Sequence, residues 1–178
     1  MSLTQKQRDQ LRQRANYACQ FCGVTETDTA GQLTIDHFQP RSKGGDDNPN
    51  NLLYSCVRCN LYKQDYWPND DEAPVLWNPL NEPAGRHFLE LDDGQLLPLT
   101  VVGEFTIKRL RLNRTPLVAY RQRKRKEAEI LRLLTQYHNL VSLLTQLNMQ
   151  LATLTSQQQQ LLATQRELLR LLLSIKED

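Results

Sequence analysis

One short segment of alternating polar and apolar residues and one short apolar run precede a long helical pattern in this chain. Residues 31–38 alternate between polar and apolar side chains, which predicts a β-strand, and residues 51–55 predict a second short strand or turn. Residues 39–50 lie between them and are dense in Gly, Pro, Asn and Asp, so they predict a loop with several turns. Residues 4–16 predict a helix before this unit, and residues 60–66 predict a short helix after it.

The connector at residues 69–103 has a different composition. It is acidic and rich in Pro, and several glycines interrupt it. Asp92-Asp93-Gly94 separates two apolar runs, at residues 88–91 and 95–97, and this pattern predicts a β-hairpin. His87 has no other candidate catalytic group near it in sequence, so we interpret it as a structural histidine.

The last third of the chain has a helical pattern. Thr115-Pro116 is typical of a helix start, with threonine as the N-cap and proline as the first helical residue, and no Pro or Gly follows it. Gln158 and Gln165 interrupt a heptad repeat of apolar residues, and Leu134, Val141, Leu162 and Leu169 widen the stripe. The apolar heptad positions are Ile130, Leu133, Tyr137, Leu140, Leu144, Leu147, Leu151, Leu154, Leu161, Leu168, Leu172 and Ile175.

An apolar stripe of this length must be buried against something. The helix could associate with other copies or with a partner protein, or it could fold back as a hairpin near residues 153–157, where helix propensity is weakest. We favour association. The polar face consists mainly of Gln and Thr, which is not typical of a membrane-surface helix, and no apolar stretch approaches the length of a transmembrane span.

Charge is distributed unevenly along the chain although its net charge is only +2. Residues 104–126 contain nine Lys or Arg and one acidic residue, a net charge of +8, whereas residues 64–103 carry −7. A segment this basic favours a polyanionic partner such as DNA. The predicted phosphate contacts in the long helix are Arg121, Arg123, Lys124 and Arg125.

The four cysteines of the chain form two Cys-x-x-Cys pairs, Cys19/Cys22 and Cys56/Cys59. Two close pairs with no odd thiol are typical of a closed tetrahedral zinc site. Disulfides are the alternative, but the N-terminal residues lack the apolar run of a signal peptide. We therefore predict a structural Zn²⁺ and a cytoplasmic protein.

Polar residues suited to phosphodiester hydrolysis lie between and just after the cysteine pairs. His37 could act as a general base, and Asp36 could bind a hard divalent ion. Asn60 could add an amide oxygen ligand, and Asn51 could hold the loop and the His37 ring by hydrogen bonds. Since neighbouring strand residues face opposite sides, Asp36 and His37 can enter one site only if the strand gives way to a turn there.

The order and spacing of these residues resemble the HNH nuclease family, and in particular its four-cysteine, zinc-stapled, McrA-like branch. The resemblance covers roughly residues 12–66. It rests on the two cysteine pairs, on Asp36-His37 followed by Pro40 and Gly44-Gly45, on Asn51, and on Asn60 directly after Cys59.

This resemblance implies a ββα-metal fold in which His37 is the general base, Asn51 orients it, and Asp36 and Asn60 bind one catalytic ion. Asn60 stands where many relatives have histidine, and an amide oxygen favours Mg²⁺ or Mn²⁺. The family also has basic residues that correspond to Arg41 and Lys63, which we predict to contact phosphates.

The sequence therefore predicts an α+β protein in three parts. Residues 1–68 form the HNH nuclease domain, residues 69–103 the connector, and residues 104–178 the basic segment and the long helix. The expected function is metal-dependent hydrolysis of DNA, in a setting such as host defence, with association through the helix. The alternative is a catalytically inactive, zinc-stabilised DNA-binding or adaptor protein.

Overall fold

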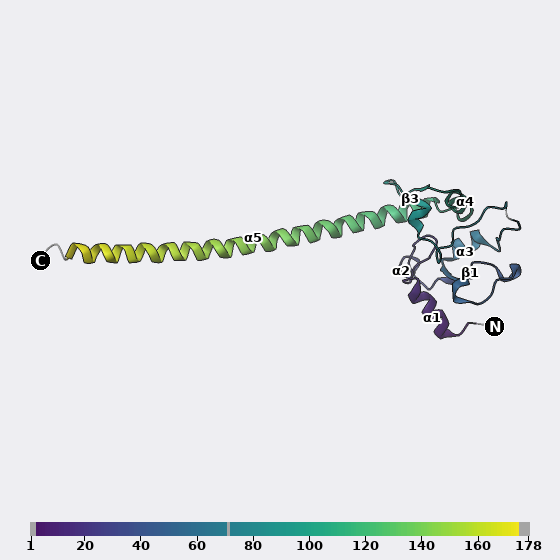
Figure 1. Ribbon diagram of the computed structural model, residues 1–178, viewed down its shortest axis with the longest axis horizontal. Helices are drawn as coiled ribbons and strands as arrows, with labels where there is room; N and C mark the ends of the chain where they lie inside the picture. The colour runs from purple at the N-terminus through teal and green to yellow at the C-terminus, as the bar shows by residue number, and fades with distance from the viewer. Residues whose placement is uncertain (1–2, 71, 175–178) are drawn as a thin grey trace. The chain divides into compact units, whose positions relative to one another are not determined.

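The computed structural model describes residues 3–70 and 72–174, and its elements are drawn in Figure 1. The chain divides into two compact units, Met1–Arg125 and Lys126–Asp178. The first is a small mixed α/β unit with two antiparallel two-stranded sheets, and the described residues of the second, 126–174, belong to one long helix. The predicted α+β class with a long C-terminal helix is confirmed, whereas the three-part division of the chain stays a prediction.

Residues 3–68, which carry the two cysteine pairs, contain three helices and two strands. These are α1 (Gln5–Arg14), α2 (Glu26–Thr29), β1 (Thr34–His37), β2 (Leu52–Ser55) and α3 (Val57–Lys63). Strands β1 and β2 are antiparallel, with Asp36 opposite Leu53. The first helix begins at a capping box in which the side chains of Thr4 and Gln7 each bind the other residue's backbone N–H. Short 3-10 turns, η1 (Arg41–Lys43) and η2 (Pro49–Asn51), shape the predicted loop.

Beyond this part, β3 (Phe88–Glu90) and β4 (Leu96–Pro98) form a hairpin where Asp92-Asp93-Gly94 predicts one. A 3-10 turn, η3 (Ala84–Arg86), precedes the hairpin, and α4 (Val101–Leu110) and α5 (Thr115–Ser174) follow it. The sequence patterns did not predict α4. Its Gly103 lies against the carbonyl oxygen of His87, so the glycine that disfavours a helix serves a close approach here.

One core joins the cysteine region to residues 76–117. Phe21 packs edge-on against Trp77, and Trp77 against Phe88, with ring centroids 6.4 and 5.1 Å apart. The backbone N–H of Trp77 donates to the hydroxyl of Thr106 at 2.8 Å. The connector at residues 69–103 is thus packed against the part of the chain that carries the cysteine pairs. The core also contains Leu53, Leu110, Leu112 and Leu117, each at most 3 % exposed.

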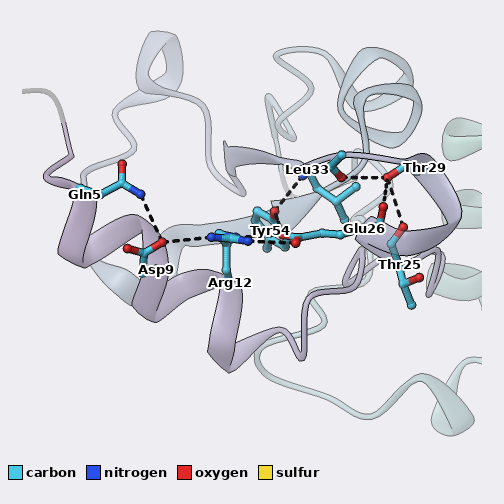
Figure 2. A network of polar contacts seen from close by, with 9 residues as sticks. Gln5, Asp9, Arg12, Thr25, Glu26, Thr29, Leu33 and Tyr54 are labelled. Atoms are coloured by element: carbon cyan, nitrogen blue, oxygen red, sulfur yellow. Dashed lines mark hydrogen bonds and ion pairs between the residues drawn. The ribbon is translucent and has the colours of Figure 1, made fainter.

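A polar network ties α1 to α2 and β2 (Figure 2). Arg12 donates two hydrogen bonds to the Glu26 carboxylate, at 2.8 and 2.9 Å. The hydroxyl of Tyr54 also donates to Glu26, and it accepts from the backbone N–H of Leu33 at 2.7 Å. The network therefore links both sides of the first cysteine pair to the strand that precedes the second pair.

The long helix is continuous from Thr115 through residues 153–157, where a fold-back hairpin would turn. The hydroxyls of Thr153 and Thr155 donate to Met149 and Leu151, one turn earlier. The hairpin alternative is therefore wrong for the described helix. Ile175 lies outside the described residues, and the Leu172 side chain is not described. No helix among the described residues is long and apolar enough to cross a membrane.

The Glu26 contacts predict a pH-dependent contribution to stability. Arg12 and then Tyr54 lower the pKa of Glu26 below its ordinary value of 4.5. The contribution of ionised Glu26 to the free energy of unfolding should therefore be complete above about pH 4.5 and disappear as the pH falls through the lowered pKa. We expect Glu26→Gln to reduce the unfolding temperature at pH 7 by a few degrees in zinc-containing buffer, with a smaller difference from wild type at acidic pH.

The matched control is Asp9→Asn, because Asp9 is the more exposed of the two carboxylates on Arg12. It should change the unfolding temperature little. An equal loss of stability in both variants, or a Glu26→Gln effect independent of pH, would contradict this account.

Candidate HNH active site and zinc centre

The four cysteines converge from two turns. Cys19 and Cys22 lie in a tight turn in which Gly23 has a φ of +77° and donates its N–H to the Cys19 carbonyl oxygen at 2.8 Å. Cys56 caps the N-terminus of α3, and Cys59 lies one turn into that helix. All four sulfur atoms are within 4.8 Å of one another, so the cluster could hold a metal ion.

The sulfur positions fit zinc. A tetrahedron with Zn–S bonds of about 2.3 Å has S–S edges of about 3.8 Å, and the Sγ atoms of Cys22 and Cys56 are 3.8 Å apart. The Arg114 guanidinium lies 3.9 Å from the Cys59 sulfur. Burial lowers the pKa of Arg114, but the neighbouring cysteine sulfurs outweigh this and raise it above its ordinary value. A cation here would offset the negative charge of four thiolates.

The second cluster lies where α3 packs on β1. The Asn60 amide is 3.4 Å from the hydroxyl of Thr34, and Lys63 Nζ is 3.2 Å from Asp36 Oδ2. Thr34 and Asp36 are two residues apart in β1 and share one face, whereas Asn60 and Lys63 are one turn apart in α3. This packing brings the two predicted metal ligands, Asp36 and Asn60, to the same interface.

Asp36 has an unusual environment. Its side chain is 11 % exposed, and its Oδ2 atom is buried and accepts no hydrogen bond, although the Lys63 ammonium is close. Burial raises the pKa of Asp36 above its ordinary value, and the charge of Lys63 partly opposes this effect. A buried carboxylate oxygen without a hydrogen bond is a suitable ligand for a hard divalent cation.

His37 points to a different set of partners from Asp36. Strand β1 stays regular through His37, so the two neighbouring side chains leave it on opposite faces, and the turn expected at this dipeptide begins only after His37. Its Nε2 atom lies 2.8 Å from Asp47 Oδ1 and 3.2 Å from Arg41 Nε, and Arg41 also pairs with Asp47. One nitrogen cannot donate to the carboxylate and accept from Arg41 at the same time. The shorter contact favours a proton on Nε2, which leaves Nδ1 as the acceptor nitrogen.

Asn51 holds the loop between the strands. Its side chain accepts the backbone N–H of Gln39 at 2.8 Å and donates to the carbonyl oxygens of Gln39 and Asp46, at 3.1 and 2.9 Å. The predicted role in fixing the loop agrees with these contacts. The predicted hydrogen bond to the His37 ring does not occur among the described residues, where both N–H groups of the Asn51 amide donate to carbonyl oxygens of the loop.

Two of the predicted phosphate contacts are wrong. Lys63 is fully buried and donates to the His37 carbonyl oxygen at 2.7 Å. Arg121 is 7 % exposed and donates to the carbonyl oxygens of Gly94 and Leu112. Both cations are therefore buried with hydrogen-bond partners inside the fold.

The other four predicted phosphate contacts are exposed side chains, and each has an intramolecular ion-pair partner. Arg41 pairs with Asp47, and its side chain is 53 % exposed. Arg123 and Lys124 both approach Asp28, and Arg125 pairs with Asp92. His87 is buried between Glu82 and Thr100, in agreement with a structural role.

Comparison with known proteins identifies the unit that carries both clusters. Residues 19–65 match the family model described as HNH endonuclease, and this segment contains all four cysteines, Asp36, His37, Asn51 and Asn60. The chain contains an HNH endonuclease domain. No curated protein and no solved structure gave a significant match to the chain.

The sequence patterns missed several residues that complete the HNH site. Asp47 contacts His37 from across the loop, Thr34 contacts Asn60, and Arg114 reaches the zinc cluster from outside the matched segment. Asp47 lies in a loop rich in Asp, Asn and Gly, so its position in sequence does not distinguish it from Asp46. Only the loop fold shows which of the two carboxylates contacts the histidine.

The loop geometry predicts a severe effect at one glycine. A Cβ atom on Gly45 would lie 1.8 Å from the Gln39 carbonyl oxygen and 2.9 Å from Asn51 Nδ2. Gly45→Ala should therefore displace the loop that Asn51 holds, with a loss of about 1–3 kcal/mol in stability, measured by chemical unfolding. Gly85→Ala is the matched control, because a Cβ atom there meets nothing within 4 Å. Equal stability of the two variants would contradict the described loop packing.

Proposed function

We propose that the protein is a metal-dependent endonuclease that hydrolyses phosphodiester bonds of DNA with His37 as the general base. The supporting observation is the packing of α3 on β1 within a segment that matches the HNH family, because it brings Asp36 and Asn60 to one interface. The match to the family supports the reaction class, and the packing supports Asp36 and Asn60 as metal ligands. The role of His37 as the base rests on its place in the matched segment.

Asp36 and Asn60 would hold the catalytic Mg²⁺ or Mn²⁺ through a carboxylate and an amide oxygen. The buried Asp36 oxygen that lacks a hydrogen bond fits this assignment. A divalent ion bound there supplies positive charge at the scissile phosphate and at the leaving oxygen. Lys63 would hold the ligand Asp36 in place. Its ammonium contacts the Asp36 carboxylate and the His37 carbonyl oxygen, and so joins the end of β1 to α3.

His37 would take the proton from the attacking water at Nδ1. A proton on Nε2 is held by Asp47, which fixes both the tautomer and the orientation of the ring. Arg41 lowers the pKa of Asp47 to about 2, with a smaller contribution from His37. Asp47 therefore stays ionised at every pH at which the enzyme would work. Asn51 contributes indirectly, by holding the loop that carries Asp47.

The DNA would contact exposed basic and aromatic side chains of the first unit. Arg41 lies beside the proposed base, and Arg123, Lys124 and Arg125 lie in the early turns of α5. A cavity of about 860 Å³ beside the zinc cluster is lined in part by Arg58, Tyr62, Arg114, Tyr120 and Arg123. Cations next to tyrosine rings suit phosphates and bases of a nucleic acid.

The zinc would be structural, and the long helix would mediate association with other chains. Four thiolates leave no open coordination position, so this ion would not take part in hydrolysis. A reducing compartment such as the cytoplasm would keep the thiols available to zinc.

The test of the proposed activity is cleavage of plasmid DNA with Mg²⁺ or Mn²⁺. We expect His37→Ala to reduce the cleavage rate by at least 100-fold, since loss of a general base typically costs 10²–10⁴-fold. The control is His138→Ala, because His138 is exposed in the long helix. Equal cleavage by wild type and His37→Ala would reject His37 as the base. DNA binding without any metal-dependent cleavage by wild type would favour the inactive adaptor.

The role of Asp47 has its own matched pair. Asp47→Asn should lower kcat by about 10-fold or more with little change in KM, since it loosens the ring of the base without removing a substrate contact. Asp46→Asn removes the same charge one residue earlier and keeps the oxygen that accepts the Asn48 N–H, so it should leave kcat unchanged. Equal effects in the two variants would mean that loop charge, and not the contact with His37, matters.

A further inference from the structure

The α5 helix exposes many large apolar side chains between residues 130 and 171. Each is 42–67 % exposed, which is far more apolar surface than an isolated soluble helix tolerates. The set comprises Ile130, Leu131, Leu133, Leu134, Tyr137, Leu140, Val141, Leu143, Leu144, Leu147, Met149, Leu151, Leu154, Leu161, Leu162, Leu168, Leu169 and Leu171. Because the described helix has no turn, its own chain cannot fold back to cover them.

We propose that the heptad stripe within this set is covered by the same helix of other copies, aligned in parallel and in register. The charge pattern supports a second copy over a foreign partner. Residues 133–165 contain no Asp, Glu, Lys or Arg. Selective pairing of unlike helices usually depends on charges beside the apolar seam, and this segment has none. An uncharged stripe is complementary to itself, with no like-charge repulsion along its length.

The polar interruptions set the direction of the helices. In the heptad repeat, Gln158 and Gln165 occupy the a positions, whereas the d positions from Leu133 to Leu168 are all leucine. A parallel, in-register assembly places each glutamine beside its equivalent, where the amides can donate and accept hydrogen bonds. An antiparallel assembly pairs a with d layers, so each glutamine would face leucine and leave a buried amide unsatisfied, at a cost of about 1–3 kcal/mol.

The width of the stripe is compatible with this assembly. Leu134, Val141, Leu162 and Leu169 fall at e positions, next to the a/d seam. A stripe wider than a strict a/d seam is typical of bundles. We therefore expect at least two chains, and the assembly can grow until the e positions are covered.

A parallel assembly has a consequence for the proposed nuclease. The HNH domain precedes the helix in every chain. With parallel helices, all HNH domains would therefore be connected to the same end of the assembly. A duplex could then meet more than one active site and be cut on both strands. This consequence rests on the proposed function, whereas the assembly itself does not.

The test uses the full-length, zinc-loaded protein. Light scattering after size exclusion should give the mass of two or more chains of 20.7 kDa each. Single cysteines at two a positions, Leu144→Cys and Gln165→Cys, should each form interchain disulfides under mild oxidation. Ser142→Cys, at an outward f position, should not. Wild type gives the background from the four native cysteines.

The outcomes separate the assembly from the activity. Two cross-linked a positions 21 residues apart require parallel, in-register helices, since an antiparallel pair can bring at most one of them together. A monomeric mass, or cross-linking at only one a position, would overturn the proposal. Plasmid cleavage is scored separately, so an inactive but cross-linked protein would reject the nuclease and retain the assembly.

Discussion

The cluster of four cysteine sulfurs, all within 4.8 Å of one another, fixes two turns that are more than 30 residues apart in the chain. Between those turns lie only the four-residue α2, a two-stranded sheet and a loop, and α3 has seven residues. Elements this short cannot build a sufficient core by themselves. Metal binding would supply folding free energy, and it would also set where α3 starts. The position of Asn60 on α3, and so its approach to β1, follows from that starting point.

The rest of the first unit supports the HNH segment from outside the matched residues. Trp77, Leu110 and Leu112 extend the core from the connector and α4. Arg109 donates to the Lys63 carbonyl oxygen at 3.0 Å, and Arg114 lies beside Cys59. Much of the basic segment therefore stabilises the HNH domain by packing and by charge. This second role explains why a segment that was predicted to bind DNA contains one buried arginine, Arg121, and the half-buried Arg109 and Arg114.

The sequence predicted the features that depend on local spacing. Cys-x-x-Cys pairs place two sulfurs together by turn geometry alone, and the Asp-Asp-Gly turn determines a hairpin within a few residues. The environments of Lys63 and Arg121 could not be predicted, because their burial depends on residues 76–117 packing across the HNH domain. The contact between His37 and Asp47, which are ten positions apart, depends on the path of the loop between β1 and β2, which a spacing rule does not give. The continuous helix was one of two predicted alternatives, and the residues near 153–157 alone did not decide between them.

The central claim is that two different metal sites share this small domain, one for folding and one for chemistry. Anomalous diffraction from crystals of the zinc-loaded protein soaked in Mn²⁺, measured at both metal edges, tests it directly. The account predicts zinc at the four cysteines and Mn²⁺ bound by Asp36 and Asn60, with Asn60→Ala losing Mn²⁺ but keeping zinc. Mn²⁺ bound away from Asp36, or absent from this interface at concentrations that support cleavage, would contradict it.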